Sequence, residues 1–186
     1  MGRILVLRTK YEYRTAKGGV KVHASLDERY MVPDIVNITA AKVSDRRGVD
    51  HFRYPKDTIV VDDRGYFDCK LFKQRVDDEN WFVCRIKDNT LYEVMSEREL
   101  PDDDDQHVLL DEEIRLTGKP AKETGMNHVR LRRIVAYIEK DNRTVVLITN
   151  TCALLVLCTS TRARSARQHG LEGIYNRRTL QKKVGN

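Results

Sequence analysis

The stretch "TIVVDDRGYFDCKLF", Thr58 to Phe72, decides the predicted fold. It begins with an apolar, β-branched run, Ile59 to Val61, which is typical of a central strand covered on both faces. The run ends abruptly on Asp62 and Asp63, and Gly65 follows. Beyond the glycine, apolar residues recur at helical spacing and predict an amphipathic helix that ends near residue 79; they are Phe67, Leu71, Phe72 and Val76.

The segments on either side extend this unit into a sheet. Residues 19–26, "GVKVHASL", alternate between apolar and polar side chains, with His23 on the polar face, and predict a half-buried strand. A second strand up to about residue 39 completes an antiparallel hairpin. Ser44 is placed to cap a short helix, and "WFVCRI" at 81–86 predicts another buried strand. This order of elements predicts a mixed α/β sheet.

Beyond residue 87 the pattern changes to short strands. A polar turn, "KDNR" at 140–143, lies between the last two of them and suits a hairpin. The acidic run "PDDDDQ" at 101–106 interrupts the series, and such runs are most often solvated loops. The predicted strands are "TLYEVM", "DEEIRLTG", "VRLRRIVAYIE" and "TVVLITN".

Length and composition indicate one globular domain. The chain has 186 residues, of which 40% are hydrophobic and 33% charged, enough for a proper core. Its apolar runs are too short to span a bilayer and no signal peptide is evident, so we expect a soluble cytoplasmic protein without a membrane partner. The cysteines have neither CxxC nor zinc-like spacing, so we expect reduced thiols; they are Cys69, Cys84, Cys152 and Cys158.

The net charge of +6 lies entirely in the last part of the chain. From Thr151 onward there are seven basic residues and one acid, Glu172, whereas the preceding 150 residues hold 27 of each sign. The segment 151–186 also shows no sustained strand or helix period. It is therefore a different kind of sequence, with the charge for non-specific contacts to nucleic acid.

Asp63 is the candidate site residue, and its chemistry has two interpretations. A carboxylate at the carboxyl end of a central strand lies where open α/β sheets bind their ligands. Several carboxylates meeting there would hold Mg²⁺ ions for phosphoryl transfer. Alternatively, Asp62 and Asp63 simply end the strand and cap the following helix. The residues alone leave both interpretations open.

A family resemblance singles out Asp63. The region from Tyr13 to Asn150 resembles the catalytic region of DDE-class transposases of bacterial insertion sequences, the insertion-sequence four family. Asp63-Arg64-Gly65-Tyr66-Phe67 is similar to the motif around that family's second acid. Further similar segments follow in the family's order: "RTAKGGVKVHASLDERYMVPDIVNITAAKVSD" upstream, then "FVCRIKDN", "YEV", "EREL", "IRLTG" and "LRRIV" downstream.

The resemblance implies a fold and an activity. The fold is a ribonuclease H-like mixed sheet with a strand-rich insertion after the fifth core strand, which gives a partial core at 1–89, the insertion at 90–150 and an atypical basic tail at 151–186. The activity is DNA transposition, a form of DNA recombination, in which Mg²⁺-assisted strand cleavage precedes transfer to target DNA. Asp63 would be catalytic and hold metal, and Arg85 and Lys87 would face the DNA backbone, unless they are solvated charges; the DNA partners would be transposon ends and target DNA.

Two departures from the family concern the other acids. The first acid belongs ahead of "KG" in a segment resembling Asp-Ser/Ala-Thr, and residues 1–16 contain no aspartate. The third belongs to Tyr-x2-Arg-x3-Glu-x6-Lys; Tyr175 and Arg178 fit, but Lys182 stands where glutamate should be. We therefore expect a fragment that lacks the first strand, exposes a sheet edge and binds Mg²⁺ weakly or not at all.

Three functional hypotheses follow. The first is a truncated transposase that is inactive alone, whose reading frame starts inside the gene and changes near Thr151. The second is a non-catalytic DNA-binding remnant that interferes with full-length transposase. The third is a metal-dependent nuclease that recruits other acids, for instance Asp27, Asp34 or Asp45.

Overall fold

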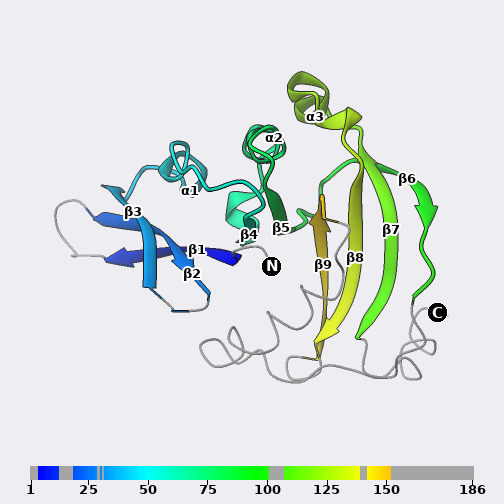
Figure 1. The fold of residues 1–186 in the computed structure, drawn as a ribbon, viewed down its shortest axis with the longest axis horizontal. Helices are drawn as coiled ribbons and strands as arrows, with labels where there is room; N and C mark the ends of the chain where they lie inside the picture. The colour runs from blue at the N-terminus through cyan, green and yellow to red at the C-terminus, as the bar shows by residue number, and fades with distance from the viewer. Residues whose placement is uncertain are drawn as a thin grey trace.

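The computed structural model describes residues 4–12, 19–28, 30, 32–100, 107–138 and 142–151. Within them, nine strands form one mixed sheet in the order β3-β2-β1-β4-β5-β9-β8-β7-β6 (Figure 1). The predicted α/β class is confirmed at this level. The strands are β1 (Ile4–Glu12), β2 (Val20–Asp27), β3 (Val32–Ala40), β4 (Ile59–Asp62), β5 (Trp81–Arg85), β6 (Tyr92–Glu97), β7 (Val108–Leu116), β8 (Leu131–Ile138) and β9 (Arg143–Thr149).

The first five strands combine a hairpin with parallel pairs. β2 and β3 pair antiparallel, as predicted, and β1 pairs antiparallel with β2. β1, β4 and β5 run parallel to one another, so their carboxyl ends meet at the same edge of the sheet. The expectation that the first strand is missing was wrong. Residues 4–12 form β1 in the interior of the sheet, and the apolar start of that strand, Ile4 to Leu7, provides the side chains for it.

The remaining strands form an antiparallel meander. β9 pairs with β5, and β8, β7 and β6 follow in turn. All four strands predicted after residue 87 are present, with ends shifted by a few residues. The acidic run 101–106, residues 140–141 of the predicted turn and the basic tail from residue 152 lie outside the described residues.

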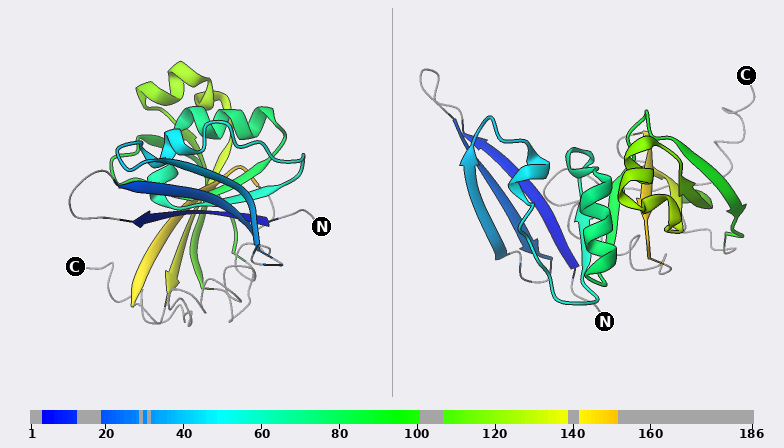
Figure 2. Two further views of the ribbon diagram at one scale, coloured as in Figure 1. Left: turned by 90° about the vertical axis from the view of Figure 1, so that its left-hand side faces the viewer. Right: turned by 90° about the horizontal axis from the view of Figure 1, so that it is seen from above.

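The helices lie on one side of the sheet (Figures 1 and 2). Within the described residues none of them is long and apolar enough to cross a membrane. Ser44 caps the first, since its Oγ accepts a 3.4 Å hydrogen bond from the Arg47 amide, but Gly48 already ends it. They are α1 (Asp45–Gly48), α2 (Cys69–Asp77) and α3 (Lys119–Thr124), with single 3₁₀ turns η1 (Arg64–Tyr66) and η2 (Met126–His128).

The main core lies between the helices and the sheet. Phe72 of α2 is fully buried and stacks on Phe82 of β5, with ring centroids 4.3 Å apart. Apolar residues of β7, β8, β9 and α3 surround this pair. A second cluster joins β1 and β4 to η1 and α2 through Leu7, Val60 and Tyr66. Together these contacts fix the position of η1, which follows the end of β4.

The faces of β2 are reversed relative to expectation. The alternation is present, but the polar side chains Lys21, His23 and Ser25 are the buried ones, whereas Val20 is 49% exposed. The reason is the cover provided by α1. Lys21 Nζ donates to the Val43 carbonyl at 2.7 Å and His23 Nε2 lies 3.0 Å from Thr39 Oγ1, so partners within the fold offset the desolvation of both groups.

Candidate functional site at the carboxyl end of β4

Asp62, the last residue of β4, is sequestered by an arginine. Arg75 of α2 donates hydrogen bonds to both carboxylate oxygens, from Nη1 to Oδ2 and, at 3.0 Å, from Nη2 to Oδ1. Both side chains are buried. Burial raises the pKa of Asp62, and the neighbouring guanidinium opposes that rise. Asp62 is thus a structural carboxylate that already has a cationic partner.

Asp63, the residue after Asp62 at the same strand end, has an exposed carboxylate instead of a buried one. Its side chain is 69% exposed, and its Oδ1 accepts a 2.7 Å hydrogen bond from the Arg64 amide. It therefore caps the 3₁₀ turn η1. The expectation that Asp62 and Asp63 cap the long helix was wrong: Asp68 caps α2, accepting from the amides of Lys70 and Leu71 at 2.9 and 3.1 Å.

The two basic residues predicted to contact DNA lie at the carboxyl end of β5, the strand next to β4: Arg85 is its last residue and Lys87 follows it. Arg85 Nη1 is 3.8 Å from Asp63 Oδ1, and its side chain is partly exposed. Lys87 Nζ donates a 2.9 Å hydrogen bond to the Phe67 carbonyl and lies 5.5 Å from the Phe67 ring centroid. The structure thus brings Arg85 next to Asp63, whereas Lys87 is held by the loop that follows η1.

Cys84 of β5 lies next to the two aspartates and contributes no metal ligand. It pairs with Asp62 across the β4–β5 ladder, and its Sγ is 3.5 Å from the Asp63 carbonyl oxygen. Burial, followed by the charge of Asp62, raises the pKa of this thiol well above its ordinary value. Metal binding needs a thiolate, so a neutral, buried thiol is unsuited to it.

The residues present do not fit a divalent cation. Mg²⁺ takes several oxygen ligands, and here Asp63 is the exposed carboxylate while Arg75 holds Asp62. The neighbouring strand β1 offers only an aliphatic side chain next to Asp62. Val6 pairs with Val61, so the next residue of β1, the buried Leu7, lies beside Asp62. Within the described ranges no group of three or more histidine, cysteine, aspartate or glutamate side chains could hold a metal ion.

The acids considered as replacements also lie elsewhere. Asp27 is buried on β2, and Asp34 lies on the outer strand β3. Asp45 pairs with Lys21 Nζ at 3.1 Å, and a Cβ on Gly65 would come within 3.2 Å of its Oδ2. In the described part of the chain none of them joins Asp63 in a metal-binding group.

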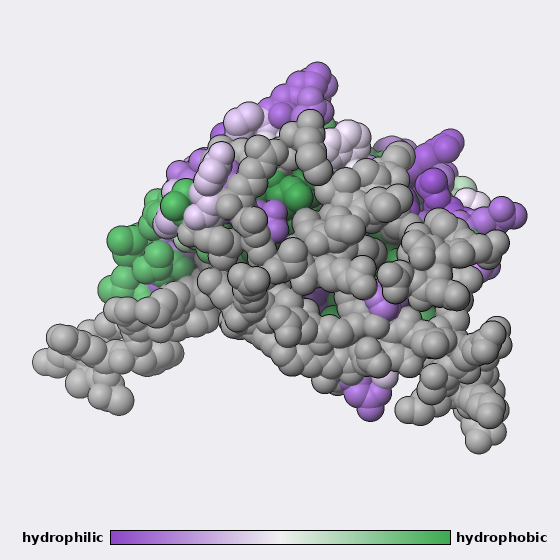
Figure 3. All heavy atoms as spheres, turned by 60° about the horizontal axis from the view of Figure 1, so that its bottom comes forward, coloured by the Kyte–Doolittle hydropathy of each residue, from purple (hydrophilic) through white to green (hydrophobic). Residues whose placement is uncertain are grey.

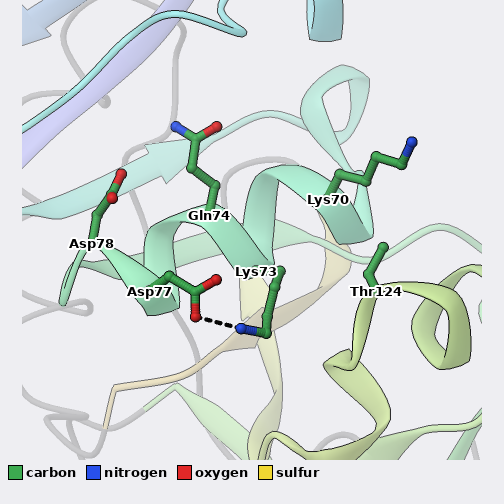
Figure 4. Close-up of a pocket in the computed structure, with 6 residues that line it drawn as sticks. All are labelled: Lys70, Lys73, Gln74, Asp77, Asp78 and Thr124. Carbon is green, nitrogen blue, oxygen red and sulfur yellow. Dashed lines mark hydrogen bonds and ion pairs between the residues drawn. The ribbon is translucent and has the colours of Figure 1, made fainter.

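A shallow pocket on the outer side of α2 is separate from this strand end. Its volume is about 440 Å³, and Thr124 at the end of α3 forms one wall (Figure 4). An ion pair between Lys73 and Asp77 occupies part of it. The other lining residues are Lys70, Gln74 and Asp78, and Asp63, Arg85 and Lys87 are not among them.

Arg75 is the residue that sequence reasoning missed. Position 75 lies three and four residues after Phe72 and Leu71, on the side of α2 that faces the core. An arginine at a predicted core position is a signal that a buried anion lies opposite. The local residue pattern alone does not indicate which of the two adjacent aspartates that anion is.

A comparison with protein families identifies the class of protein to which this chain belongs. The fold is a mixed α/β sheet with an exposed aspartate after a central parallel strand, and the family model described as "Transposase DDE domain" matches residues 7–180. The chain therefore belongs to the transposase DDE domain family. The match passes Asn150 and includes residues 151–180, so the expectation that the family resemblance ends at Asn150 was wrong.

The other two comparisons concern solved structures and curated proteins. The chain is similar to the crystal structure of an endonuclease V from Bacillus subtilis, with a TM-score of 0.35 and 7% sequence identity. That similarity covers 80% of this chain and 64% of the endonuclease, which is less than two thirds of its length. No curated protein matches the chain.

Proposed function

We propose that the chain is part of the catalytic domain of an insertion-sequence transposase of the insertion-sequence four type, and that it does not cleave DNA by itself. In this proposal β1 to β5 are the ribonuclease H-like core and β6 to β9 are the strand-rich insertion. The family match supports the transposase assignment, and the position of β6 to β9 after β5 in the chain supports the division. The protein would act on transposon ends and target DNA in the cytoplasm.

The isolation of Asp63 is the observation that supports inactivity. In the proposed role Asp63 is the second acid of the DDE site and a magnesium ligand. Its neighbour Asp62 is committed to Arg75, and Leu7 offers no carboxylate from β1. Because magnesium affinity depends on the number of oxygen ligands, we expect one exposed carboxylate to bind the ion weakly.

Plasmid nicking tests this proposal. Supercoiled DNA carrying insertion-sequence ends would be incubated with the chain and Mg²⁺ or Mn²⁺, beside an Asp63→Ala variant. We expect equal, background rates for the two proteins. Metal-dependent nicking that the wild-type chain performs and the variant does not would overturn the proposal, because it would show an assembled metal site.

A second candidate function is a non-catalytic DNA-binding remnant that competes with full-length transposase. The charge distribution favours it, since residues 151–186 carry the whole net charge of +6. Arg85 adds a partly exposed cation at the strand end, and Lys87 a second one nearby. Cations of this kind bind phosphates without sequence preference, and such binding weakens steeply with salt.

A gel shift at several salt concentrations distinguishes the candidates. The matched variant replaces the seven basic residues after Thr151 with glutamine, and a second variant replaces Arg85 alone. If the basic segment binds DNA, the first variant lowers the slope of log affinity against log salt by about 0.9 for each phosphate that the segment no longer neutralises. An unchanged slope in that variant would contradict the DNA-binding role of the segment.

The change of reading frame near Thr151 stays a prediction. It is supported by the shift in charge balance and by Lys182 at the expected glutamate position. The family match to residue 180 opposes it, because the match continues past Thr151. The encoding DNA, read in the other two frames after codon 150, should contain Tyr-x2-Arg-x3-Glu-x6-Lys; its absence would refute the frame change.

A further inference from the structure

β3 is the outermost strand of the sheet and leaves one backbone edge without a neighbouring strand in the described part of the chain (Figures 1 and 2). Natural proteins usually protect such an edge with charged residues, prolines or a covering segment. In β3 such protective residues occur only at the beginning of the strand, where Pro33 and Asp34 lie. The following six residues, "IVNITA" at 35–40, carry no charge, and four of them are β-branched residues with high strand propensity.

The apolar side of this edge is open to solvent. Val36 is 50% exposed and Ile38 is 65% exposed. They pair with Ala24 and Val22 of β2, so the apolar surface continues onto the next strand. The hydrophobic spheres at the left of Figure 3 show it from the side away from the helices. We call the residues Val20, Val32, Val36 and Ile38 the edge patch.

The opposite side of β3 is anchored in the fold. Asn37 Nδ2 donates a 2.7 Å hydrogen bond to the Gly48 carbonyl, and Thr39 Oγ1 lies 3.0 Å from His23 Nε2. His23 is fully buried. These contacts fix which face of the strand is turned outward, so the edge patch is a preformed surface rather than one that can rotate into the core.

We propose that β3 pairs antiparallel with β3 of a second copy of this chain, about a two-fold axis at Ile38. This register places Val36 opposite Ala40 and Ile38 opposite its counterpart. It also brings Asp34 of each copy level with the exposed Lys42 of the other, so the charges at both ends are complementary. The same surface serves both copies, so the contact closes as a dimer and does not propagate.

The proposed dimer is weak and independent of the transposase assignment. A contact along one strand edge lies at the small end of protein interfaces, below about 1,200 Å² in total. We therefore expect association in the micromolar range or weaker. Because the contact uses neither Asp63 nor the basic residues after Thr151, it can fail while the proposed function stands, and the reverse is also true.

Sedimentation velocity of the full chain over a wide concentration range tests the proposal. Ile38→Lys should weaken dimerisation at least tenfold, because it places two ammonium groups at the axis. Leu91→Lys is the matched control: Leu91 is also 65% exposed, but it lies beside β6 at the other edge of the sheet. Circular dichroism and thermal unfolding establish that both variants are folded.

A charge exchange tests the register. Lys42→Asp should weaken the dimer, and the double variant Asp34→Lys/Lys42→Asp should restore it. A chain that stays monomeric at all concentrations would overturn the proposal. Unchanged association of Ile38→Lys, or its loss in Leu91→Lys, would overturn it in favour of another surface, and failure of the double variant to recover would overturn the register.

Discussion

Arg75 of α2 holds Asp62 of β4 with hydrogen bonds to both carboxylate oxygens, in a place where neither side chain reaches solvent. This pair links the helix to the sheet directly beneath the exposed Asp63. It separates two adjacent aspartates into a structural residue and a candidate site residue.

Replacing Arg75 alone should strongly lower the free energy of unfolding. Arg75→Met leaves Asp62 buried without its partner, and breaking such a pair typically costs about 3–5 kcal/mol. The double variant Asp62→Leu/Arg75→Met should be much closer to wild type in urea unfolding, because it leaves no uncompensated charge.

Arg53→Ala provides the control for the arginine, since its ion pair with Asp78 is 3.9 Å long and exposed. We expect a change below about 1 kcal/mol there. Equal destabilisation in Arg75→Met and Arg53→Ala would show that burial of the Asp62 pair has no special energetic role.

Gly48→Ala should destabilise the fold through a clash. A Cβ at this position would lie 2.2 Å from His23 Nε2, and His23 is fully buried and cannot move aside. Overpacking of this kind costs about 1–3 kcal/mol. The additional change His23→Ala should recover part of the stability in thermal unfolding.

Gly118→Ala is the matched control for this glycine. A Cβ at Gly118 would meet its nearest atoms at 3.7 and 3.8 Å, which is ordinary contact. Its backbone is extended, with φ of −63°, so no conformational strain arises. A destabilisation as large as that of Gly48→Ala would contradict the steric explanation.

Asp68→Ala should cost more than Asp63→Ala. Asp68 accepts two backbone hydrogen bonds at the start of α2, and loss of a helix cap costs about 1 kcal/mol, within a range of about 0.5–2. Asp63 caps only the 3₁₀ turn and is largely exposed. If denaturant unfolding shows the reverse order, Asp63 has a larger structural role than its hydrogen bond indicates.

Alkaline pH should destabilise the protein through Tyr54. Burial raises the pKa of this phenol from 10 to about 12, so the folded state favours its neutral form. The corresponding stability is fully present below pH 10 and is lost as the pH rises through 12, by at most about 3 kcal/mol.

The Tyr54→Phe variant isolates that contribution from the other tyrosines. Ultraviolet absorbance reports phenolate formation, and unfolding at each pH reports stability. The stability of wild type should fall relative to that of the variant, by at most about 3 kcal/mol, as the pH rises from 10 to 12. A difference that does not depend on pH in this range would show that Tyr54 ionises as it does in the unfolded chain.

Much of the fold could be predicted because its signals are local. The apolar run Ile59 to Val61 became β4, the alternation at 19–26 became β2, and the predicted strands after residue 87 formed. β1 was not predicted as a core strand. Its place between β2 and β4 depends on pairing with segments distant in sequence, which no local pattern reports.

The candidate site was only partly predictable for the same reason. The order of residues 58–67 located the strand end, and the family resemblance singled out Asp63, which the structure places exposed at that end. The hydrogen-bonded ion pair between Asp62 and Arg75 depends on how α2 packs against β4, because Arg75 lies thirteen residues after Asp62 in the chain.

By itself the sequence determined the strand–turn–helix unit around "TIVVDDRGYFDCKLF" and the antiparallel hairpin before it, because periodicity and turn residues act over a few positions. Only the tertiary structure decided which face of β2 is buried and which of two adjacent aspartates is exposed. Both outcomes depend on a partner from elsewhere in the chain. A buried polar side chain is stable only beside such a partner, and packing alone brings the two together.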